Sequence, residues 1–445
     1  FAIMGLDEYS IQTADETTLL RGPVNGDLTF SEADFEKKQL EDDDPTGDEL
    51  SKQRNPDQLV YRSIFLVVMP IFCGYAALFS LQGEVMKAIY GQDQTDEPTI
   101  FGIACSMLYF GNLIFRLGHN VVFGFAIPRT RVVISMAAMT LSMWTVFSIF
   151  VWFRNDDRYV FLVFIGYGLG GVAIGTFESN VLSMITPLGK DTKLWAIIAI
   201  PVGINTVNIG GFIALGYSDW LQSNPEAIHF CVMSFCLFGV LILYIFLYDK
   251  CDYISSFSIM DFFRSFLAWK EWIWTIKYNC AAMTIDMFCV SLFSPGVILY
   301  IYDGPCIEFT ITGFIMNSFW FVAIYNSFFF LGDTLSRKIF YLVKLINPFY
   351  FLLFSLGGIF MGLIDITILV PLTALGVSFA NGSLYTQTNR LIDKEVPEKY
   401  NLVALSFWLF VGDIGSVLGS NTISFLSTWI KELYNTPVLS SAACA

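Results

Sequence analysis

Apolar residues dominate the chain from Arg62 onward, and short polar stretches interrupt them at regular intervals. Each apolar stretch is longer than the roughly 20 residues that a helix needs to cross the hydrocarbon core of a bilayer. We expect spans at 63–86, 99–127, 132–153, 159–186, 194–217, 227–248, 272–301, 311–335, 339–361, 366–388 and 401–430. The pattern predicts an all-α polytopic membrane protein with about eleven transmembrane helices.

The longest connection between spans, DKCDYISSFSIMDFFRSFLAWKE at 249–271, mixes Phe, Ile and Leu with charges. Such a mixture is typical of an amphipathic helix that lies in the membrane interface. It divides the predicted spans into a six-helix bundle at 59–248 and a five-helix bundle at 272–435, followed by a short tail at 436–445. A 6+5 arrangement of two bundles is the predicted architecture.

Residues 1–58 differ from the rest because they hold fifteen Asp or Glu against five Lys or Arg. A segment with high charge and few apolar residues cannot bury enough apolar area to offset its chain entropy. We expect a disordered tail or a strap that docks on a protein partner.

Lys and Arg concentrate in the cytoplasmic loops of membrane proteins. Fifteen of them fall on the side that eleven spans assign to the N-terminus: Arg62, Arg129, Arg131, Lys190, Lys193, Lys250, Arg264, Lys270, Lys277, Arg337, Lys338, Lys344, Arg390, Lys394 and Lys399. The opposite side has four: Lys87, Arg154, Arg158 and Lys431. This asymmetry predicts an inside N-terminus and an outside C-terminus, in a plasma or an organelle membrane.

Composition agrees with a membrane protein, since 55% of the residues are hydrophobic and only 14% are charged. The nine cysteines have no metal-ligand spacing, so we expect packed thiols and no disulfide framework. Two histidines make a histidine metal site unexpected. No dinucleotide or phosphate-binding glycine motif, basic nucleic-acid footprint, or nucleophile with its base is found. The sequence therefore predicts no cofactor, no metal, no nucleic-acid partner and no enzymatic activity.

Ionisable side chains at membrane depth are costly, and they usually face a bundle interior or a water-filled path. In FFFLGDTLSRK, Asp333 and Arg337 are four residues apart, so a helix places them on one face within pairing distance. They form either a structural clamp at a helix end or part of a substrate path, where the carboxylate accepts hydrogen bonds from a solute and Arg337 donates them.

Other charges fall inside the predicted spans: Arg116 and His119 in the second, Glu178 in the fourth, Asp286 in the seventh and Asp413 in the eleventh. Arg116 or His119 is a candidate partner of Glu178, because opposite charges on neighbouring spans lower each other's burial cost. Asp286 and Asp413 are either satisfied by neighbouring hydroxyls or carry protons. Glycines before Glu178 favour close helix packing.

Three stretches resemble the equilibrative nucleoside transporter family, best over residues 280–430. They are MFCVSLFSPGVILYIYDG with FVAIYNSFFFLGDTLSRK, then FANGSLYTQTNRLIDKEVPEK, then FWLFVGDIGSVLGSNTISFL. The family's Asp and Arg correspond here to Asp333 and Arg337, and its Asn-Gly pair corresponds to Asn381 and Gly382. The resemblance implies an eleven-span, major-facilitator-like fold that moves nucleosides or nucleobases across a bilayer.

Several positions depart from the family pattern. Ile71 and Phe72 replace the Trp and Asn that commonly follow the first-span proline, and Ser336 replaces the Gly before the family's Arg. Thr176 lies near the place of a Gln associated with nucleobase recognition, and Glu178 is an extra charge. The substrate is therefore less defined than the fold.

The sequence predicts a carrier of nucleosides, nucleobases or a similar small polar solute, working by alternating access. Asp333, Arg337, Asn381, Thr176 and Glu178 are the candidate substrate-binding or gating residues. Two alternatives remain open: a transporter-like fold that serves as a structural subunit of a larger membrane complex, and a proton-coupled carrier of another solute.

Overall fold

The computed structural model describes residues 61–91, 99–251, 259–293, 306–309, 311–364 and 366–433. The acidic tail, the end of the seventh predicted span at 294–301 and the C-terminal tail lie outside the described residues. The described part of residues 57–445 forms one compact unit that is almost entirely helical.

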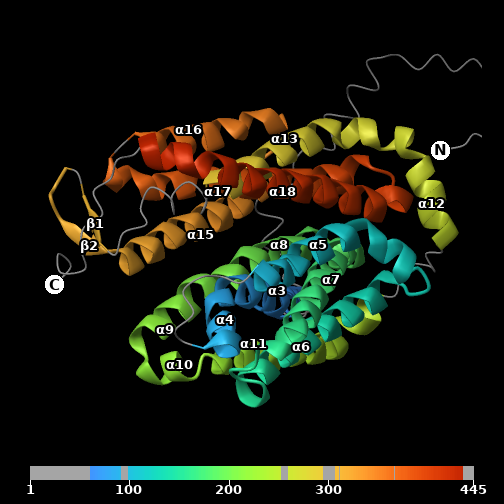
Figure 1. Ribbon diagram of the computed structural model, residues 1–445. Helices are drawn as coiled ribbons and strands as arrows, with labels where there is room; N and C mark the ends of the chain where they lie inside the picture. The colour runs from blue at the N-terminus through green and yellow to red at the C-terminus, as the bar shows by residue number, and fades with distance from the viewer. Residues whose placement is uncertain are drawn as a thin grey trace, which may run out of the picture. The chain divides into compact units, whose positions relative to one another are not determined.

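One group of helices contains the six N-terminal predicted spans (Figure 1). Its longer helices are α3 (Ile64–Ser80), α4 (Gln82–Tyr90), α5 (Thr99–Val122), α6 (Pro128–Trp152), α7 (Val160–Ile185), α8 (Lys190–Asn205) and α11 (Glu226–Ile242). Short elements continue them: η1 (Asp157–Tyr159), η2 (Thr186–Leu188), η3 (Thr206–Gly211), α9 (Phe212–Tyr217), α10 (Asp219–Ser223), η4 (Leu243–Leu247) and η5 (Tyr248–Cys251).

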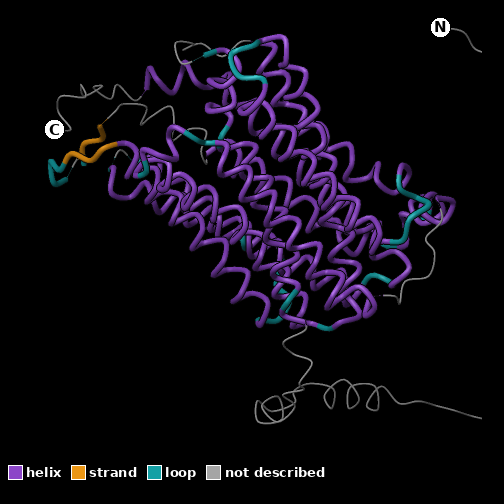
Figure 2. Tube along the Cα trace, turned by 90° about the horizontal axis from the view of Figure 1, so that it is seen from below, coloured by secondary structure: helices purple, strands orange, loops and turns teal. Residues whose placement is uncertain are grey.

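A second group contains the five C-terminal predicted spans. Its longer helices are α13 (Ile273–Ser291), α15 (Ser318–Leu342), α16 (Leu352–Leu363), α17 (Val370–Glu395) and α18 (Asn401–Leu433). The short helices of this part are η6 (Trp269–Glu271), η8 (Pro348–Tyr350), η9 (Thr367–Leu369) and η10 (Glu398–Tyr400). The helices of both groups run side by side along most of their length (Figure 2).

Among the described residues, seven helices are long and apolar enough to cross a membrane, and a bent pair raises this number to eight. The bent pair is α3 and α4, which meet at an angle of 54°. The remaining predicted spans contain the shorter α16 and the more polar α13 and α15. A helix therefore occupies each of the eleven predicted segments, and the prediction of an all-α polytopic fold is confirmed.

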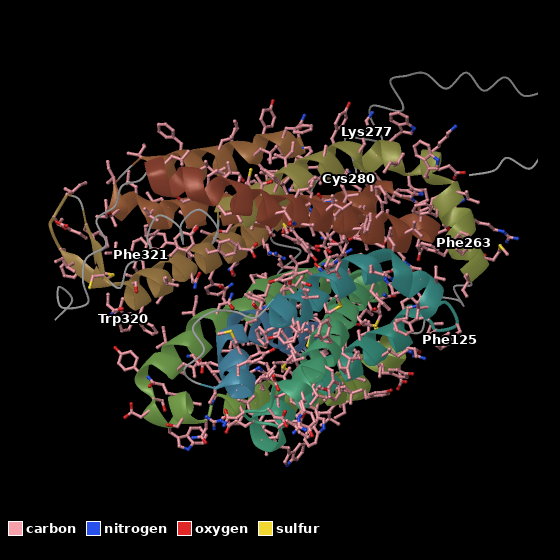
Figure 3. The ribbon with its side chains drawn as sticks, in the orientation of Figure 1. Phe125, Phe263, Lys277, Cys280, Trp320 and Phe321 are labelled. Carbon is pink, nitrogen blue, oxygen red and sulfur yellow. The ribbon has the colours of Figure 1, made fainter. Side chains whose placement is uncertain are left out.

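The predicted amphipathic segment contains α12 (Ile259–Leu267), which packs against α5 and α18. Phe262 is buried, whereas Phe263 is 45% exposed. Phe263 and Phe125, which is 82% exposed, lie at the same end of the helices in Figure 3. An alternation of buried and exposed aromatic residues on a short charged helix is typical of the membrane interface.

Two short strands precede α15. Strand β1 (Cys306–Glu308) pairs antiparallel with β2 (Ile315–Asn317), in a register that places Cys306 opposite Asn317. Cys306 is disulfide-bonded, while the other seven cysteines among the described residues are not in disulfides. The expectation that the cysteines form no disulfide is therefore wrong for Cys306. Its position explains the error, since it lies in a connection rather than inside an apolar span.

The fifth predicted span changes its helical geometry midway. After Pro201, the α-helix gives way at Thr206 to the π-helical turn η3. The Asn205 side-chain amide donates a hydrogen bond to the Pro201 carbonyl at 2.9 Å. Proline has no N–H, so Pro201 makes no backbone hydrogen bond to the Ile197 carbonyl four residues earlier. This helix contacts α15 of the second group.

Candidate functional site

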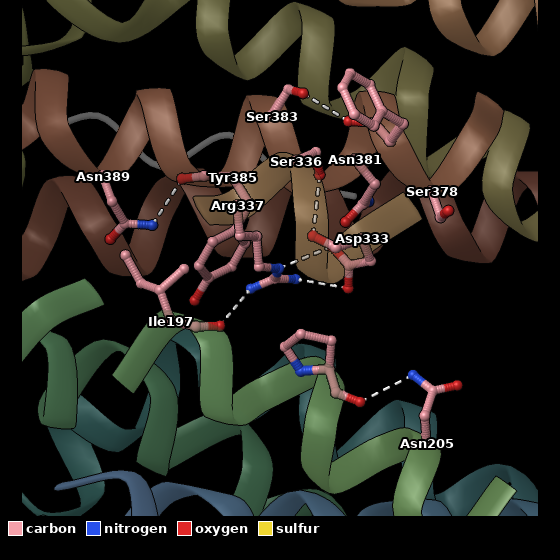
Figure 4. Close-up of polar contacts among 12 residues, drawn as sticks. Ile197, Asn205, Asp333, Ser336, Arg337, Ser378, Asn381, Ser383, Tyr385 and Asn389 are labelled. Carbon is pink, nitrogen blue, oxygen red and sulfur yellow. Dashed lines mark hydrogen bonds and ion pairs between the residues drawn. The ribbon is translucent and has the colours of Figure 1, made fainter. Parts of the chain in front are cut away.

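Asp333 and Arg337 form a buried ion pair on α15. The Arg337 Nε donates to Asp333 Oδ1 at 2.8 Å and Nη2 donates to Oδ2 at 3.2 Å. The two side chains are only 8% and 4% exposed. The remaining Nη1 of Arg337 reaches across to α8 and donates to the Ile197 carbonyl oxygen at 3.1 Å (Figure 4). The pair predicted from the spacing thus also joins the two groups of helices.

A glycine on α17 leaves room for this pair. A Cβ atom on Gly382 would lie 2.6 Å from Asp333 Oδ1 and 2.5 Å from the Asp333 backbone oxygen. Real side chains do not approach that closely, so only glycine permits α17 to pack at this distance from α15. The close packing of α15 and α17 fixes the position of the Asp333 carboxylate.

Arg116 of α5 is the centre of a second cluster. Its Nη1 lies 2.5 Å from Glu178 Oε2 on α7, and its Nε lies 2.7 Å from Asp413 Oδ2 on α18. The Asn112 amide, one turn earlier on α5, also donates to Asp413 Oδ2 at 3.1 Å. Arg116 therefore neutralises one carboxylate of its own group of helices and one of the other group.

Glycines bring α5 and α7 into the contact that this cluster needs. A Cβ on Gly171 would lie 2.5 Å from the Leu108 carbonyl oxygen, and one on Gly175 would lie 2.6 Å from the Asn112 carbonyl oxygen. The glycine-rich part of α7 therefore packs directly on the α5 backbone. Glu178, three residues beyond Gly175, then lies beside Arg116.

Tyr385 of α17 connects the two clusters. Its hydroxyl donates to Glu178 Oε1 at 2.6 Å, and its ring lies under the Arg337 guanidinium, 4.2 Å from the Cζ atom to the ring centroid. A guanidinium over an aromatic ring is attracted to the negative face of the ring. Contacts therefore run without a break from Asp333 through Arg337, Tyr385 and Glu178 to Arg116.

The other predicted site residues lie around this chain of contacts. The Asn381 amide on α17 lies 3.0 Å from the Met287 sulfur. Thr176 is fully buried on α7, with no hydrogen bond to its hydroxyl, and its carbonyl accepts from Asn180. The ring of His119 contacts the Phe115 carbonyl at 2.7 Å. Neither His119 nor Asp286 is ion-paired with Arg116, Glu178 or Asp413.

A further cluster joins α8 and α17 closer to the helix ends. The Lys193 ammonium lies 2.6 Å from both carboxylate oxygens of Asp393, which also accepts from the Asn401 amide at 3.2 Å. Nearby, the Tyr341 hydroxyl donates to the Lys190 carbonyl at 2.6 Å. Together with the bond from Arg337 to Ile197, these contacts hold α8 against the second group of helices.

Tyr385, Lys193, Asp393 and Asn112 were not predicted as site residues. Lys193 was counted only among the Lys and Arg of the loops on one side, and Asp393 was not singled out, although opposite charges near the ends of spans can pair. Tyr385 follows Asn381 by four residues, so the two share a polar helix face. That periodicity is the signal that identifies Tyr385 as a candidate.

The cluster offers both donors and acceptors to a polar ligand. Two guanidinium groups, Arg116 and Arg337, face three carboxylates, Asp333, Glu178 and Asp413, so the set carries an excess of one negative charge when all are ionised. Among the described residues, no group of three or more His, Cys, Asp and Glu side chains is arranged to hold a metal ion.

No protein-family model matches the sequence, and no curated protein matches it. Solved structures of the major facilitator superfamily match the fold. The proton:xylose symporter XylE, bound to 6-bromo-6-deoxy-D-glucose, has a TM-score of 0.60 at 12% identity, over 84% of this chain and 90% of that one. FucP in the outward conformation has 0.59 at 15% identity, over 83% and 93%. An outward-facing bacterial homologue of the iron transporter ferroportin has 0.59 at 12% identity, over 84% and 95%. The chain therefore has a major-facilitator-like fold.

Proposed function

We propose that this protein is a membrane carrier that moves a small polar solute by alternating access between its two groups of helices. The observation that carries the proposal is the buried chain of contacts from Asp333 to Asp413. In it, Arg116 pairs with Asp413 and Tyr385 pairs with Glu178, each across the boundary between the groups. Buried charges held between two bundles are expected where the bundles must separate and rejoin around a hydrated path.

A nucleoside or nucleobase is the proposed solute, and membership of the equilibrative nucleoside transporter family is proposed with it. The Asp333 and Arg337 pair and the Asn381–Gly382 step support this, since they match the family's pattern. Asp333 accepts hydrogen bonds from ribose hydroxyls, Arg337 donates to ring or sugar oxygens, and Asn381 adds a neutral hydrogen-bonding group. When the path is closed and no solute is bound, Glu178 accepts the hydrogen bond from the Tyr385 hydroxyl.

The proposed topology places the N-terminus inside and the C-terminus outside. The distribution of Lys and Arg supports it. The disulfide of Cys306 supports it as well, because this topology places Cys306 outside and disulfides persist in oxidising compartments.

Uptake of labelled adenosine and uridine into proteoliposomes tests the proposal. Asp333→Asn alone leaves the Arg337 charge buried without its partner, which is strongly destabilising. The double variant Asp333→Asn/Arg337→Gln removes both charges together and is the better test. Saturable uptake by the intact protein, and its loss in the folded double variant, is the expected result. No uptake of any nucleoside by the folded intact protein would contradict the proposed substrate.

A further inference from the structure

Asp286 is a buried carboxylate that the chain of contacts described above does not include. It lies on α13 and is fully buried. Its Oδ1 accepts a hydrogen bond from the Ser355 hydroxyl of α16 at 2.7 Å, and the side chain of Asn381 on α17 lies beside it. Its Oδ2 is buried, and the described part of the chain provides no hydrogen-bond partner for it. Three helices thus enclose a carboxyl group that has one unused oxygen.

No cation balances this group within the described residues. Asp286 forms no ion pair there, and the charged side chain within electrostatic reach is another carboxylate, Asp333 of α15. Helix α16 has no titratable residue between Leu352 and Leu363. On its own helix, the nearest titratable group is the free thiol of Cys289.

The titratable groups of the other packed helices are turned elsewhere. On α17, Tyr385 is directed to Glu178, and Arg390 donates to the Phe340 carbonyl of α15. On α18, Asp413 faces Arg116. The short helix η8 packs near Tyr278, toward the opposite end of α13.

An ionised carboxylate without a cation is unstable in such surroundings, and a buried acid of this kind takes up a proton instead. The proton has one available position. Oδ1 already accepts from Ser355, so a hydronium ion gives its proton to Oδ2 and is left as water, which converts the carboxylate to a neutral carboxylic acid. The reaction needs no further reactant.

One turn of α17 links Asp286 to the proposed solute site. Asn381 contacts Asp286 and Met287, while the adjacent Gly382 lies against Asp333 (Figure 4 shows Asn381 beside Asp333). The carboxylates of Asp286 and Asp333 therefore lie next to adjacent residues of α17, Asn381 and Gly382. Asp333 in turn holds Arg337, whose Nη1 reaches the Ile197 carbonyl of the other group of helices.

We propose that Asp286 is a proton-binding site, and that its protonation controls the solute site through Asn381 and Asp333. Proton binding removes one of the two negative charges carried by Asp286 and Asp333, which influence each other electrostatically. This changes the relative strengths of the two interactions of Arg337, the ion pair with Asp333 and the hydrogen bond to the Ile197 carbonyl. The transport consequence rests on the proposed carrier function, because it makes uptake of the solute depend on a proton gradient.

Infrared difference spectroscopy of the full chain in nanodiscs tests the site without any solute. We expect the C=O band of a protonated carboxylic acid at neutral pH. Asp286→Asn should remove this band, while Asp219→Asn, an exposed aspartate next to α9, should retain it. Ser355→Ala should shift the band, because the hydrogen bond to Oδ1 is lost. Spectra of folded Asp286→Asn and Ser355→Ala that match the unsubstituted protein would overturn the proposal.

Proteoliposome transport tests the coupling. We expect an inward-directed proton gradient to stimulate nucleoside uptake by the unsubstituted protein. Asp286→Asn should lose this stimulation but retain exchange of labelled for unlabelled solute. Gradient-independent uptake by both proteins would overturn the coupling. If no nucleoside is taken up at all, the proposed solute is wrong, and the infrared band still decides whether Asp286 binds a proton.

Discussion

The hydroxyl and the ring of Tyr385 make different contacts. The hydroxyl satisfies Glu178, and the ring supports the Arg337 guanidinium. Glu178 is only 5% exposed in its side chain, so it cannot exchange this bond for water. A hydrogen bond to a charged group contributes about 1.5–3 kcal/mol. The hydroxyl of Tyr385 is therefore a sensitive point of the boundary between the two groups of helices.

Tyr385→Phe removes the hydroxyl and keeps the ring. We expect uptake to fall by about tenfold or more, since ~1.4 kcal/mol corresponds to a factor of ten. Initial uptake rates in proteoliposomes measure this, with thermal unfolding in detergent as the measure of folding. Tyr400→Phe is the matched control, because the Tyr400 hydroxyl also donates to a glutamate, Glu271, at 2.6 Å but outside the site. Equal effects of the two variants would argue against a special role for Tyr385.

At the scale of helices, the closest approaches occur where glycines face backbone or polar atoms. Gly382 of α17 faces Asp333, and Gly171 of α7 faces the α5 backbone. The contact at Gly171 helps to bring Glu178 of α7 beside Arg116 of α5, and the contact at Gly382 fixes the position of the Asp333 carboxylate. The packing distance between these helices therefore sets the positions of the buried charged side chains. A substitution that changes this distance also moves the charges.

Gly382→Ala places a methyl group 2.6 Å from Asp333 Oδ1 and 2.5 Å from the Asp333 backbone oxygen, closer than real side chains approach. Overpacking of this kind typically costs about 1–3 kcal/mol. We expect a lower unfolding temperature and weaker uptake, because α15 must move away from α17. Gly357→Ala on α16 is the control, since a Cβ there meets no atom within 4 Å. Should both variants unfold at the temperature of the unsubstituted protein, the contact at Gly382 is not tight.

On the scale of the whole molecule, two layers of contacts join the groups of helices. One layer is the buried chain from Asp333 to Asp413. The other lies near the helix ends, where Lys193 binds Asp393. Alternating access requires that at least one of these layers breaks in each transport cycle.

Exchange of the charges at the second layer tests its role. Lys193→Asp or Asp393→Lys alone places two like charges together, so we expect either one to reduce uptake strongly. The double variant restores an ion pair with the opposite direction and should recover part of the lost uptake. Such recovery is the signature of a direct interaction in a double-mutant cycle. If the double variant is no better than the singles, the pair does not act as a unit.

Local information explains which parts of the site were predictable. Asp333 and Arg337 are four residues apart on one helix, so their pairing follows from helix geometry alone. The need to neutralise buried charges left Arg116 and His119 as candidate partners of Glu178, and the structure pairs Glu178 with Arg116. Lys193 and Asp393 are two hundred residues apart, and nothing in the local sequence indicates that they meet.

The sequence by itself determined the membrane class, the presence of a helix in each predicted segment and the one pair that lies within a single helix. These follow from hydrophobic length and helical periodicity, which are local properties of the chain. Only the tertiary structure decided that Asp413 joins Arg116, that Tyr385 links the two clusters, and that Asp286 stands apart with Ser355. The reason is physical: the choice of partner for a buried charge depends on which helices pack together, and that is settled by packing over the whole molecule.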